Sequence, residues 1–340
     1  MKVAFLSYSF GREKSSIGKY GWHLANELRK LDVCVDIFQT KFHIKTLGPP
    51  IFYLKNAFLR LEDYDIVHSN EGAGVFLHHP CMIETYHHDY KQPYDINSLT
   101  FHKLEMLQCH KVRHIIVPSF ATKKALLRYG FKEDKISVIH HGVDHSVFRK
   151  KNSRVLLKRK YGILNHFVVI NVGTFIKRKR QNDIIEALAG IPDTVLILVG
   201  RGEEEKNIKE LTREKKVKLL HFKYVPESFL VDLYNVADVY IHTSVLEGFG
   251  LTVLEAMACG LPVIAYKTAD LGHIIDNAGY LTNVGDIEGI RSALWLLYKN
   301  SDVRKERGQN AIDRSKGFSW SETAKKHAQV YKNALHQVWK

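Results

Sequence analysis

The sequence predicts an α/β protein of two tandem Rossmann-like, doubly wound domains that face each other across a cleft. Short β-branched or apolar runs alternate with longer helical patterns along most of the chain, as in parallel sheets covered by helices. A charged segment poor in strand formers, residues 145–165, interrupts this alternation before it restarts. The 340 residues, 45% of them hydrophobic, suffice for two cores. Because ligands bind beyond the carboxyl ends of parallel strands, we expect the cleft to hold the ligand.

The first domain is expected over residues 1–150. Its alternating runs predict strands at 3–9, 33–38, 65–70, 82–88, 114–119 and 135–142, and helices at 21–31 and 121–130. A last helix over 321–340 follows the second domain in sequence. We expect the segment 320–340 to pack back across the first domain and to join it.

The second domain is expected over residues 151–319, where the pattern starts again. Strands are predicted at 167–173, 194–200, 217–222, 238–244 and 261–266, and helices at 181–191, 203–215, 228–237, 251–258 and 285–300. Gly260 and Pro262 end the helix over 251–258.

Composition narrows the class of protein. The net charge of +14 is concentrated in residues 1–160, which favours an anionic partner such as nucleic acid, a lipid headgroup surface or a phosphorylated acceptor; solubility alone explains it equally well. No apolar run reaches the roughly 20 residues that span a bilayer, and the opening MKVAFLSYSF lacks a signal-peptide pattern, so we expect a cytoplasmic protein. Four scattered cysteines indicate neither disulfides nor a structural metal.

The stretch HTSVLEGFGLTVLEAMACGLPVIA, residues 242–265, contains the most informative chemistry. Its pattern of strand, glycine loop and helix leaves the first N–H groups of the helix free for an anion such as phosphate, and the glycines allow close approach. Glu247 and Glu255 flank this loop and can accept hydrogen bonds from vicinal hydroxyls. A ligand with phosphate in its middle and a polyhydroxylated ring at either end would satisfy both the N–H groups and the glutamates. A nucleotide-diphosphate sugar is such a ligand. From the residues alone, a capping glutamate and a solvent-facing glutamate on an ordinary turn remain the alternative.

EGFGLTVLEAMACGLPVIA resembles the E-x7-E motif of the glycosyltransferase group 1 family, whose members are retaining, nucleotide-sugar-dependent enzymes of the GT-B fold. The resemblance implies that Glu247 lies by the donor sugar and that Glu255 binds the ribose hydroxyls. It further implies that backbone amides of the loop hold sugar and phosphate.

NVGTFIKRKRQNDIIEAL resembles the family's turn after the first strand of the donor domain. The resemblance implies that Lys179 pairs with the diphosphate and stabilises the leaving group. Thr174 stands where the family usually has Arg, and Arg178 can supply the missing charge. Lys177 and Arg180 are interpreted as surface charges.

Two first-domain segments extend the resemblance. The loop SSIGKY resembles the family's loop at the first helix, with Ser16 where glycine is usual and Gly18 retained; a plain helix cap by Ser15 or Ser16 is the alternative. MIETYHHDY places His87 where a family histidine approaches the donor sugar, and the resemblance implies that His88 or Asp89 contacts the sugar or the acceptor.

The expected catalytic residues are His87, Glu247 and Lys179. The expected donor-binding residues are Gly173, Arg178, Lys179, Gly200, Val225, Ser244, Glu247, Gly248, Phe249, Gly250, Leu251, Thr252, Glu255, Ser16 and Gly18. Asp63 and Asp65 form a D-x-D pair, which binds a metal in another glycosyltransferase fold; here Asp65 opens a strand, and the pair is interpreted as structural.

The resemblance implies transfer of a hexose from a UDP- or GDP-sugar to an acceptor hydroxyl, with retention and without cofactor or metal. The expected acceptor is a sugar, lipid-linked or anionic molecule of glycan, glycolipid or cell-envelope polysaccharide synthesis. The basic and apolar segment 41–63 leaves open either a peripheral contact at the inner membrane surface or a buried helix. The alternatives are a nucleotide-sugar epimerase of similar architecture and a basic nucleic-acid-binding protein. No nucleic acid is expected as partner, because no recognition motif is present.

Overall fold

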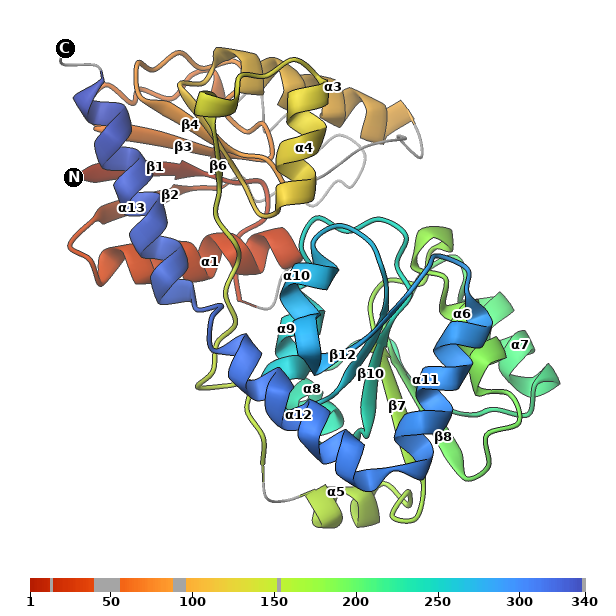
Figure 1. Cartoon of the computed structure of the whole chain (residues 1–340). Coiled ribbons are helices and arrows are strands. Elements are labelled where there is room, and N and C mark those ends of the chain that lie inside the picture. The colour runs from red at the N-terminus through yellow and green to blue at the C-terminus, as the bar shows by residue number, and fades with distance from the viewer. Residues whose placement is uncertain (13–14, 40–55, 88–95, 152–153, 338–340) are drawn as a thin grey trace. The chain divides into compact units, whose positions relative to one another are not determined.

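The computed structural model describes residues 1–12, 15–39, 56–87, 96–151 and 154–337 (Figure 1). The chain forms two compact units, one of residues 1–142 with 320–340 and one of residues 143–319. The boundary lies before the position expected near 150. Val143 donates a backbone hydrogen bond to Phe318 O (3.0 Å), and the buried Phe148 belongs to the core of the second unit, so both residues fold with that unit.

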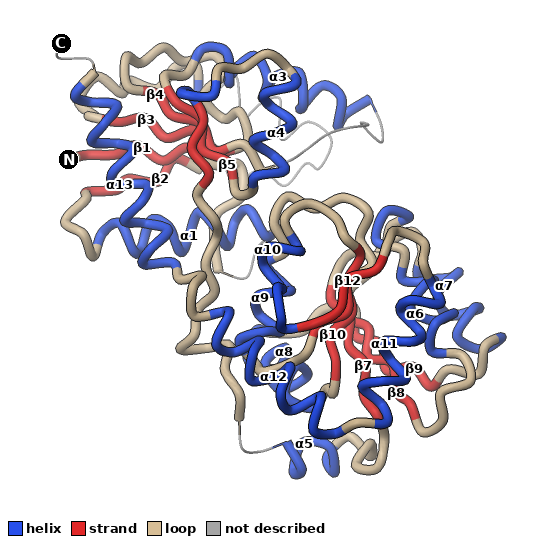
Figure 2. Tube along the Cα trace, in the orientation of Figure 1, coloured by secondary structure: helices blue, strands red, loops and turns tan. Residues whose placement is uncertain are grey.

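The first unit contains a parallel six-stranded sheet in the order β2-β1-β3-β4-β5-β6 (Figure 2). Its strands are β1 (Lys2–Leu6), β2 (Cys34–Phe38), β3 (Ile66–Asn70), β4 (Met82–Thr85), β5 (His114–Val117) and β6 (Ile136–Val138). Its helices are α1 (Ser16–Arg29), α3 (Ile96–Lys111), α4 (Phe120–Arg128), η1 (Glu133–Lys135) and α13 (Trp320–His336). The strand order reverses between β1 and β3, which is where a doubly wound sheet opens a ligand site.

The second unit contains a parallel six-stranded sheet in the order β12-β11-β10-β7-β8-β9. Its strands are β7 (Phe167–Val172), β8 (Thr194–Val199), β9 (Lys218–Phe222), β10 (Val239–His242), β11 (Val263–Tyr266) and β12 (Gly279–Thr282). Its helices are α5 (Arg154–Lys160), η2 (Lys177–Lys179), α6 (Gln181–Leu188), α7 (Glu205–Glu214), α8 (Glu227–Val236), α9 (Leu251–Ala258), α10 (Leu271–Ile275), η3 (Asp276–Ala278), α11 (Ile287–Lys299) and α12 (Ser301–Ser315). Here the order reverses between β7 and β10.

Both faces of the second sheet are buried. Val168 and Ile170 of β7 pack into one hydrophobic cluster, whereas Phe167 and Val169 pack into another on the opposite face. This alternation follows from the two-residue period of a strand, and helices cover both faces as parallel sheets require. The buried core fixes the strand register, and the carboxyl ends of β7 and β10 are thereby held in place.

Helix α13 belongs to the first unit although the second unit precedes it in sequence. Figure 1 shows it alongside α1. Tyr20 of α1 lies 2.9 Å (Oη to Nε2) from His327, and His68 of β3 lies 2.5 Å (Nδ1 to Oη) from Tyr331. These buried polar contacts fix α13 against α1 and the sheet. No helix in the described part of the chain is long and apolar enough to cross a membrane.

Candidate functional site

The loops at the carboxyl ends of β7 and β10 form the candidate site of the second unit. β10 ends at His242, and residues 243–250 connect it to α9; β7 leads through the short helix η2 into α6. Because the strand order reverses between β7 and β10, these two loops lead to helices on opposite faces of the sheet, α6 in one hydrophobic cluster and α9 in the other. The opening between them is the usual ligand position in a doubly wound sheet.

Gly250 sets the entry into α9. Its φ of 101° is left-handed, a conformation that glycine adopts readily. A Cβ there would lie 3.0 Å from Leu271 Cδ2, so a larger residue would also crowd Leu271. No side chain caps the helix. The N–H groups of Leu251 and Thr252, in the first turn, thus belong to an uncapped helix N-terminus that suits an anion.

Glu247 is held by two cationic or polar partners. Lys179 Nζ donates to its Oε1, and His242 Nε2 lies 3.0 Å from the same oxygen. Burial by itself raises the pKa of Glu247, but the charges of Lys179 and His242 and the hydrogen bonds from both outweigh it and hold this pKa well below its usual range. Glu247 is therefore ionised at neutral pH.

His242 is a site residue that the sequence reasoning missed. Its Nδ1 lies 3.3 Å from Tyr240 Oη, which donates to Thr252 Oγ1 at 2.8 Å. A continuous polar network therefore runs from Glu247 through His242 to the first turn of α9. The available signal was the position of His242 at the end of a predicted strand, directly before the glutamate loop.

Hydrogen bonds tie the η2 turn to the glutamate loop. Val245 N donates to Arg178 O (2.9 Å), Arg178 Nη1 donates to Leu246 O (2.8 Å), and Thr243 Oγ1 donates to Lys179 O (2.8 Å). The position of Lys179 relative to Glu247 is thus fixed by the backbone as well as by their ion pair. In this structure the Arg178 guanidinium orders the loop.

Glu255 lies on the second turn of α9 and is 4% exposed. Its Oε2 accepts a hydrogen bond from Tyr234 Oη of α8 (3.2 Å). Burial is the main cause, and the charge of Glu255 the second, of the rise in the pKa of Tyr234 well above its usual range. Tyr234 therefore remains a hydroxyl donor. Glu247 is also only 13% exposed, and no side chain caps α9, so the alternative of one capping and one solvent-facing glutamate is wrong. Tyr234 was not anticipated, because the contact joins two helices far apart in sequence.

The glycines after β7 and β8 allow these strand ends to approach closely. A Cβ at Gly200, whose φ is 147°, would lie 1.9 Å from Gly173 O. Ser244 is buried and donates through Oγ to Leu246 O (2.9 Å), which shapes the loop before Glu247. Phe249 is 3% exposed and its ring packs 6.2 Å from that of Phe318, so its side chain belongs to the core.

Two further predicted residues lie at the edges of this region. Gly248 is half-buried beside Glu247. Val225 packs against the hydrophobic core at the start of α8.

In the first unit, His87 follows β4 and is 4% exposed. Its Nε2 lies 2.5 Å from Asn70 Oδ1 at the end of β3, and Asn70 Nδ2 donates to Ser7 Oγ (3.0 Å) after β1. The ring of Tyr20 contacts His87 edge-on, with centroids 4.7 Å apart. His87 thus lies where the carboxyl ends of three strands meet. Asn70, Ser7 and Tyr20 were not anticipated.

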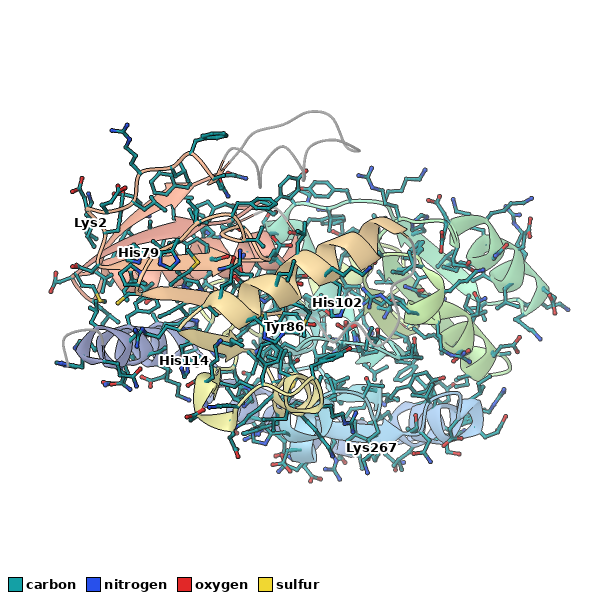
Figure 3. All side chains as sticks on the ribbon, turned by 90° about the horizontal axis from the view of Figure 1, so that it is seen from above. Lys2, His79, Tyr86, His102, His114 and Lys267 are labelled. Atoms are coloured by element: carbon teal, nitrogen blue, oxygen red, sulfur yellow. The ribbon has the colours of Figure 1, made fainter. Side chains whose placement is uncertain are left out.

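Tyr86 and His102, both labelled in Figure 3, lie next to this position. Tyr86 Oη is 3.5 Å from His102 Nδ1 of α3. This contact connects the segment before His87 to the neighbouring helix. His88 and Asp89 lie outside the described residues, as does most of the basic and apolar segment 41–63.

The helix-cap alternative holds at the start of α1. Ser15 Oγ accepts from Gly18 N (3.2 Å) and lies 2.9 Å from Ser9 Oγ. Ser16 is exposed as the first helical residue, while Gly18 is buried and accepts through its carbonyl from Gly11 N (3.1 Å).

Asp65 Oδ2 accepts from Lys2 N (2.6 Å), in keeping with the structural interpretation of the D-x-D pair. Among the described residues, no three His, Cys, Asp or Glu side chains converge as metal ligands.

Comparison with known proteins gives two family matches. Residues 154–314 match the model for glycosyl transferases group 1, and residues 38–147 match the model for glycosyltransferase family 4. N-acetyl-alpha-D-glucosaminyl L-malate synthase of Bacillus anthracis is 30% identical over 52% of this chain, and the match spans about half (48%) of that relative. O-antigen chain mannosyltransferase B of Escherichia coli is 24% identical over 98% of this chain and 100% of its own length.

Solved structures share the fold. Sucrose-phosphate synthase of Thermosynechococcus elongatus superposes with a TM-score of 0.85 at 20% identity, covering 99% of this chain and 100% of its own. Anabaena HepE in complex with UDP and glucose superposes with a TM-score of 0.78 at 22% identity, and the match covers 98% of this chain and 100% of HepE. The predicted two-domain α/β fold is confirmed, and the family matches support a glycosyltransferase of the GT-B fold.

Proposed function

We propose that this protein is a retaining hexosyltransferase that transfers a sugar from a UDP- or GDP-sugar to an acceptor hydroxyl. The observation that carries the proposal is the convergence of Glu247 and Lys179 beside the uncapped N-terminus of α9, at the β7 and β10 switch point. The UDP and glucose bound to the Anabaena neighbour are of the same ligand class. The E-x7-E spacing of Glu247 and Glu255 supports the retaining assignment by resemblance.

The donor diphosphate competes with Glu247 for Lys179. In the structure the Lys179 ammonium neutralises Glu247, and both groups are largely buried. A diphosphate at the N-terminus of α9 offers Lys179 a stronger anionic partner, so its ammonium turns toward the phosphates. Glu247, still contacted by His242, is then available to the hydroxyls of the donor sugar.

Glu255 is assigned to the ribose. Tyr234 donates to one of its carboxylate oxygens and thereby orients the carboxylate for hydroxyl groups. Phosphate contacts come from the backbone of Gly250, Leu251 and Thr252.

Departure of the nucleoside diphosphate develops negative charge on its phosphates. Lys179, Arg178 and the N-terminus of α9 offset this charge, so the proposed reaction needs neither metal nor cofactor. The acceptor hydroxyl attacks from the face that the diphosphate leaves and loses its proton to a phosphate oxygen, which retains the anomeric configuration. His87 is assigned to the donor sugar.

The proposed acceptor is a sugar, lipid-linked or anionic molecule of glycan, glycolipid or cell-envelope polysaccharide synthesis. Relatives named for O-antigen mannosyl transfer and inositol phosphate glycosyl transfer support this class. The cationic excess of the first 160 residues suits an anionic acceptor or an anionic leaflet. We propose a cytoplasmic location with peripheral contact at the inner membrane surface.

A thermal-shift screen with UDP-glucose, UDP-N-acetylglucosamine and GDP-mannose tests donor binding. At a donor concentration about 100 times the Kd, binding adds about 2.7 kcal/mol to the free energy of unfolding and raises Tm. The binding donor is then incubated with and without acceptor, and the products are separated by chromatography. Epimerised nucleotide sugar formed without acceptor would overturn the transferase in favour of an epimerase.

A further inference from the structure

A cationic recess lies in the second unit at the amino ends of the strands, opposite the glutamate loop. Its cavity volume is about 280 Å³, and Asp238 and Pro262, the residues just before β10 and β11, line it. The charged side chains that line the recess are Lys150, Lys151, Arg154, Lys158, Arg304, Lys305 and Asp238. We propose that this recess binds a phosphate or pyrophosphate group of a small soluble molecule, at a site separate from the donor site.

The charges around Asp238 do not balance. Its Oδ1 accepts from Arg154 Nη2 at 2.5 Å, its Oδ2 accepts from Lys158 Nζ at 2.8 Å, and Arg304 Nε lies 3.7 Å from Oδ1. Three cations thus share one carboxylate, whose side chain is only 10% exposed. Burial, which outweighs the charge of Asp238, lowers the pKa of Lys158, and the neighbouring Arg154 and Arg304 lower it further. An anion in the recess offsets that excess.

Lys150 adds a further cation to the recess. Its ammonium makes no hydrogen bond or ion pair with the described residues, whereas Lys151 pairs with Asp232 (2.7 Å) and Lys305 with Asp302 (3.0 Å).

The backbone of this segment is nevertheless fixed. Asn235 Nδ2 donates to Arg149 O (3.0 Å), and Lys151 N donates to Asn235 Oδ1 (2.7 Å). The Lys150 side chain is therefore presented at the recess from an ordered segment with its charge unused.

The N-terminus of α12 also adds positive charge to the recess. Ser301, its first residue, lines the recess, and Asn300 makes no side-chain cap. The free N–H groups of this 15-residue helix carry partial positive charge. The carboxyl ends of α8 and α9 also border the recess and offset part of the cationic charge, which leaves the Asp238 cluster and Lys150 as the source of the excess.

The chemistry and size indicate the ligand class. Arginine, lysine and uncapped N–H groups together favour phosphate oxygens, which accept several charge-assisted hydrogen bonds at once. A volume of about 280 Å³ lies below the usual range for drug-sized ligands, so the recess suits a pyrophosphate or a small phosphorylated molecule.

Isothermal titration with inorganic pyrophosphate tests the proposal. The titration uses the full chain carrying Lys179→Ala, so that the lysine contact to phosphate in the donor site is removed and pyrophosphate binding there is weakened. We expect saturable binding that weakens as salt is raised from about 20 to about 150 mM. No saturable binding in this background would overturn the proposal.

Charge reversal at Lys150 locates the site. In the Lys179→Ala background, Lys150→Glu should weaken pyrophosphate binding roughly tenfold or more, and Lys150→Gln should weaken it severalfold. Arg159→Glu is the matched control, because Arg159 is exposed on the nearby α5, does not line the recess and gives the same change in charge. The pyrophosphate affinity of the Arg159→Glu control should stay within about twofold of that of the Lys179→Ala protein. Equal losses for Lys150→Glu and Arg159→Glu, or no loss for Lys150→Gln and Lys150→Glu in folded protein, would refute the site.

Discussion

The Lys179 ammonium donates a hydrogen bond to Glu247 Oε1, and the two side chains are only 15% and 13% exposed. The pair joins the turn after β7 to the loop after β10, which are 68 residues apart in sequence. Loss of either side chain leaves the other charge without its main partner. That unpaired charge is costly because it is largely shielded from water. This ion pair is accordingly the most sensitive point of the proposed donor site.

Replacement of Lys179 by alanine should lower kcat by roughly 100- to 1000-fold, because a preorganised donor to the developing phosphate charge is lost. Transfer kinetics with saturating donor measure this effect. Lys177→Ala is the control in the same turn, since Lys177 is exposed and lies outside the ion pair. Full transfer rates for a folded Lys179→Ala protein would show that the site is wrongly assigned.

Replacement of Tyr234 by phenylalanine should weaken donor binding about fivefold while kcat changes little. The substitution removes the hydrogen bond to Glu255 Oε2 and so releases the carboxylate assigned to the ribose, at a cost of about 1 kcal/mol. KM for the nucleotide sugar and the Kd for free nucleoside diphosphate measure the effect. Tyr161→Phe, which alters a half-buried tyrosine outside this contact, should leave both constants unchanged. A fall in kcat at constant KM for Tyr234→Phe would contradict the ribose role of Glu255.

Replacement of Gly250 by alanine should destabilise the second unit by about 1–3 kcal/mol and abolish donor binding. The left-handed φ of 101° disfavours alanine, and its Cβ would press on Leu271. Gly162→Ala is the comparison, since Gly162 has a φ of 64° with no atom within 4 Å of the added Cβ. It should cost about 1 kcal/mol and leave donor binding intact. Urea unfolding and nucleotide titration measure the two effects, and equal behaviour of both variants would refute the steric argument.

The histidines under α13 should make the first unit sensitive to acid. Burial lowers the pKa of His327 from 6.5 to about 4, so the neutral form is favoured in the folded state. The stability that depends on neutral His327 is present above pH 6.5 and is lost as pH falls toward 4, by about 1.4 kcal/mol per pH unit.

His327→Gln should remove this contribution. Between pH 6.5 and 5 the wild-type protein should lose about 2 kcal/mol more free energy of unfolding than the variant. Urea unfolding followed by tryptophan fluorescence, to which Trp320, buried at the start of α13, contributes, measures the difference. His336→Gln, at the exposed end of the same helix, should follow the wild-type curve. Parallel curves for all three proteins would refute the assignment to His327.

Elements with a strong apolar period could be predicted, and those without one could not. The β7 run Phe167–Val172 and α6 were both anticipated, because their apolar residues recur at the period of a strand or helix. Helix α12 was not, since its buried residues are only Gly308, Ala311 and Ser315 and its sequence is otherwise polar. Strand β12 was also missed, because all four of its residues are half-buried and no alternation marks it.

The sequence by itself determined most of the strands and helices in their order, two sheets of the same kind and a glycine loop with Glu247 and Glu255 at a strand end. These features depend on local periodicity and on spacing within a single segment. The partners of both glutamates depended on tertiary structure: Lys179 and His242 meet Glu247, and Tyr234 meets Glu255, only after the sheet register and the packing of α8 against α9 are set. Such contacts join segments that no local pattern relates, and the buried core decides which of them form.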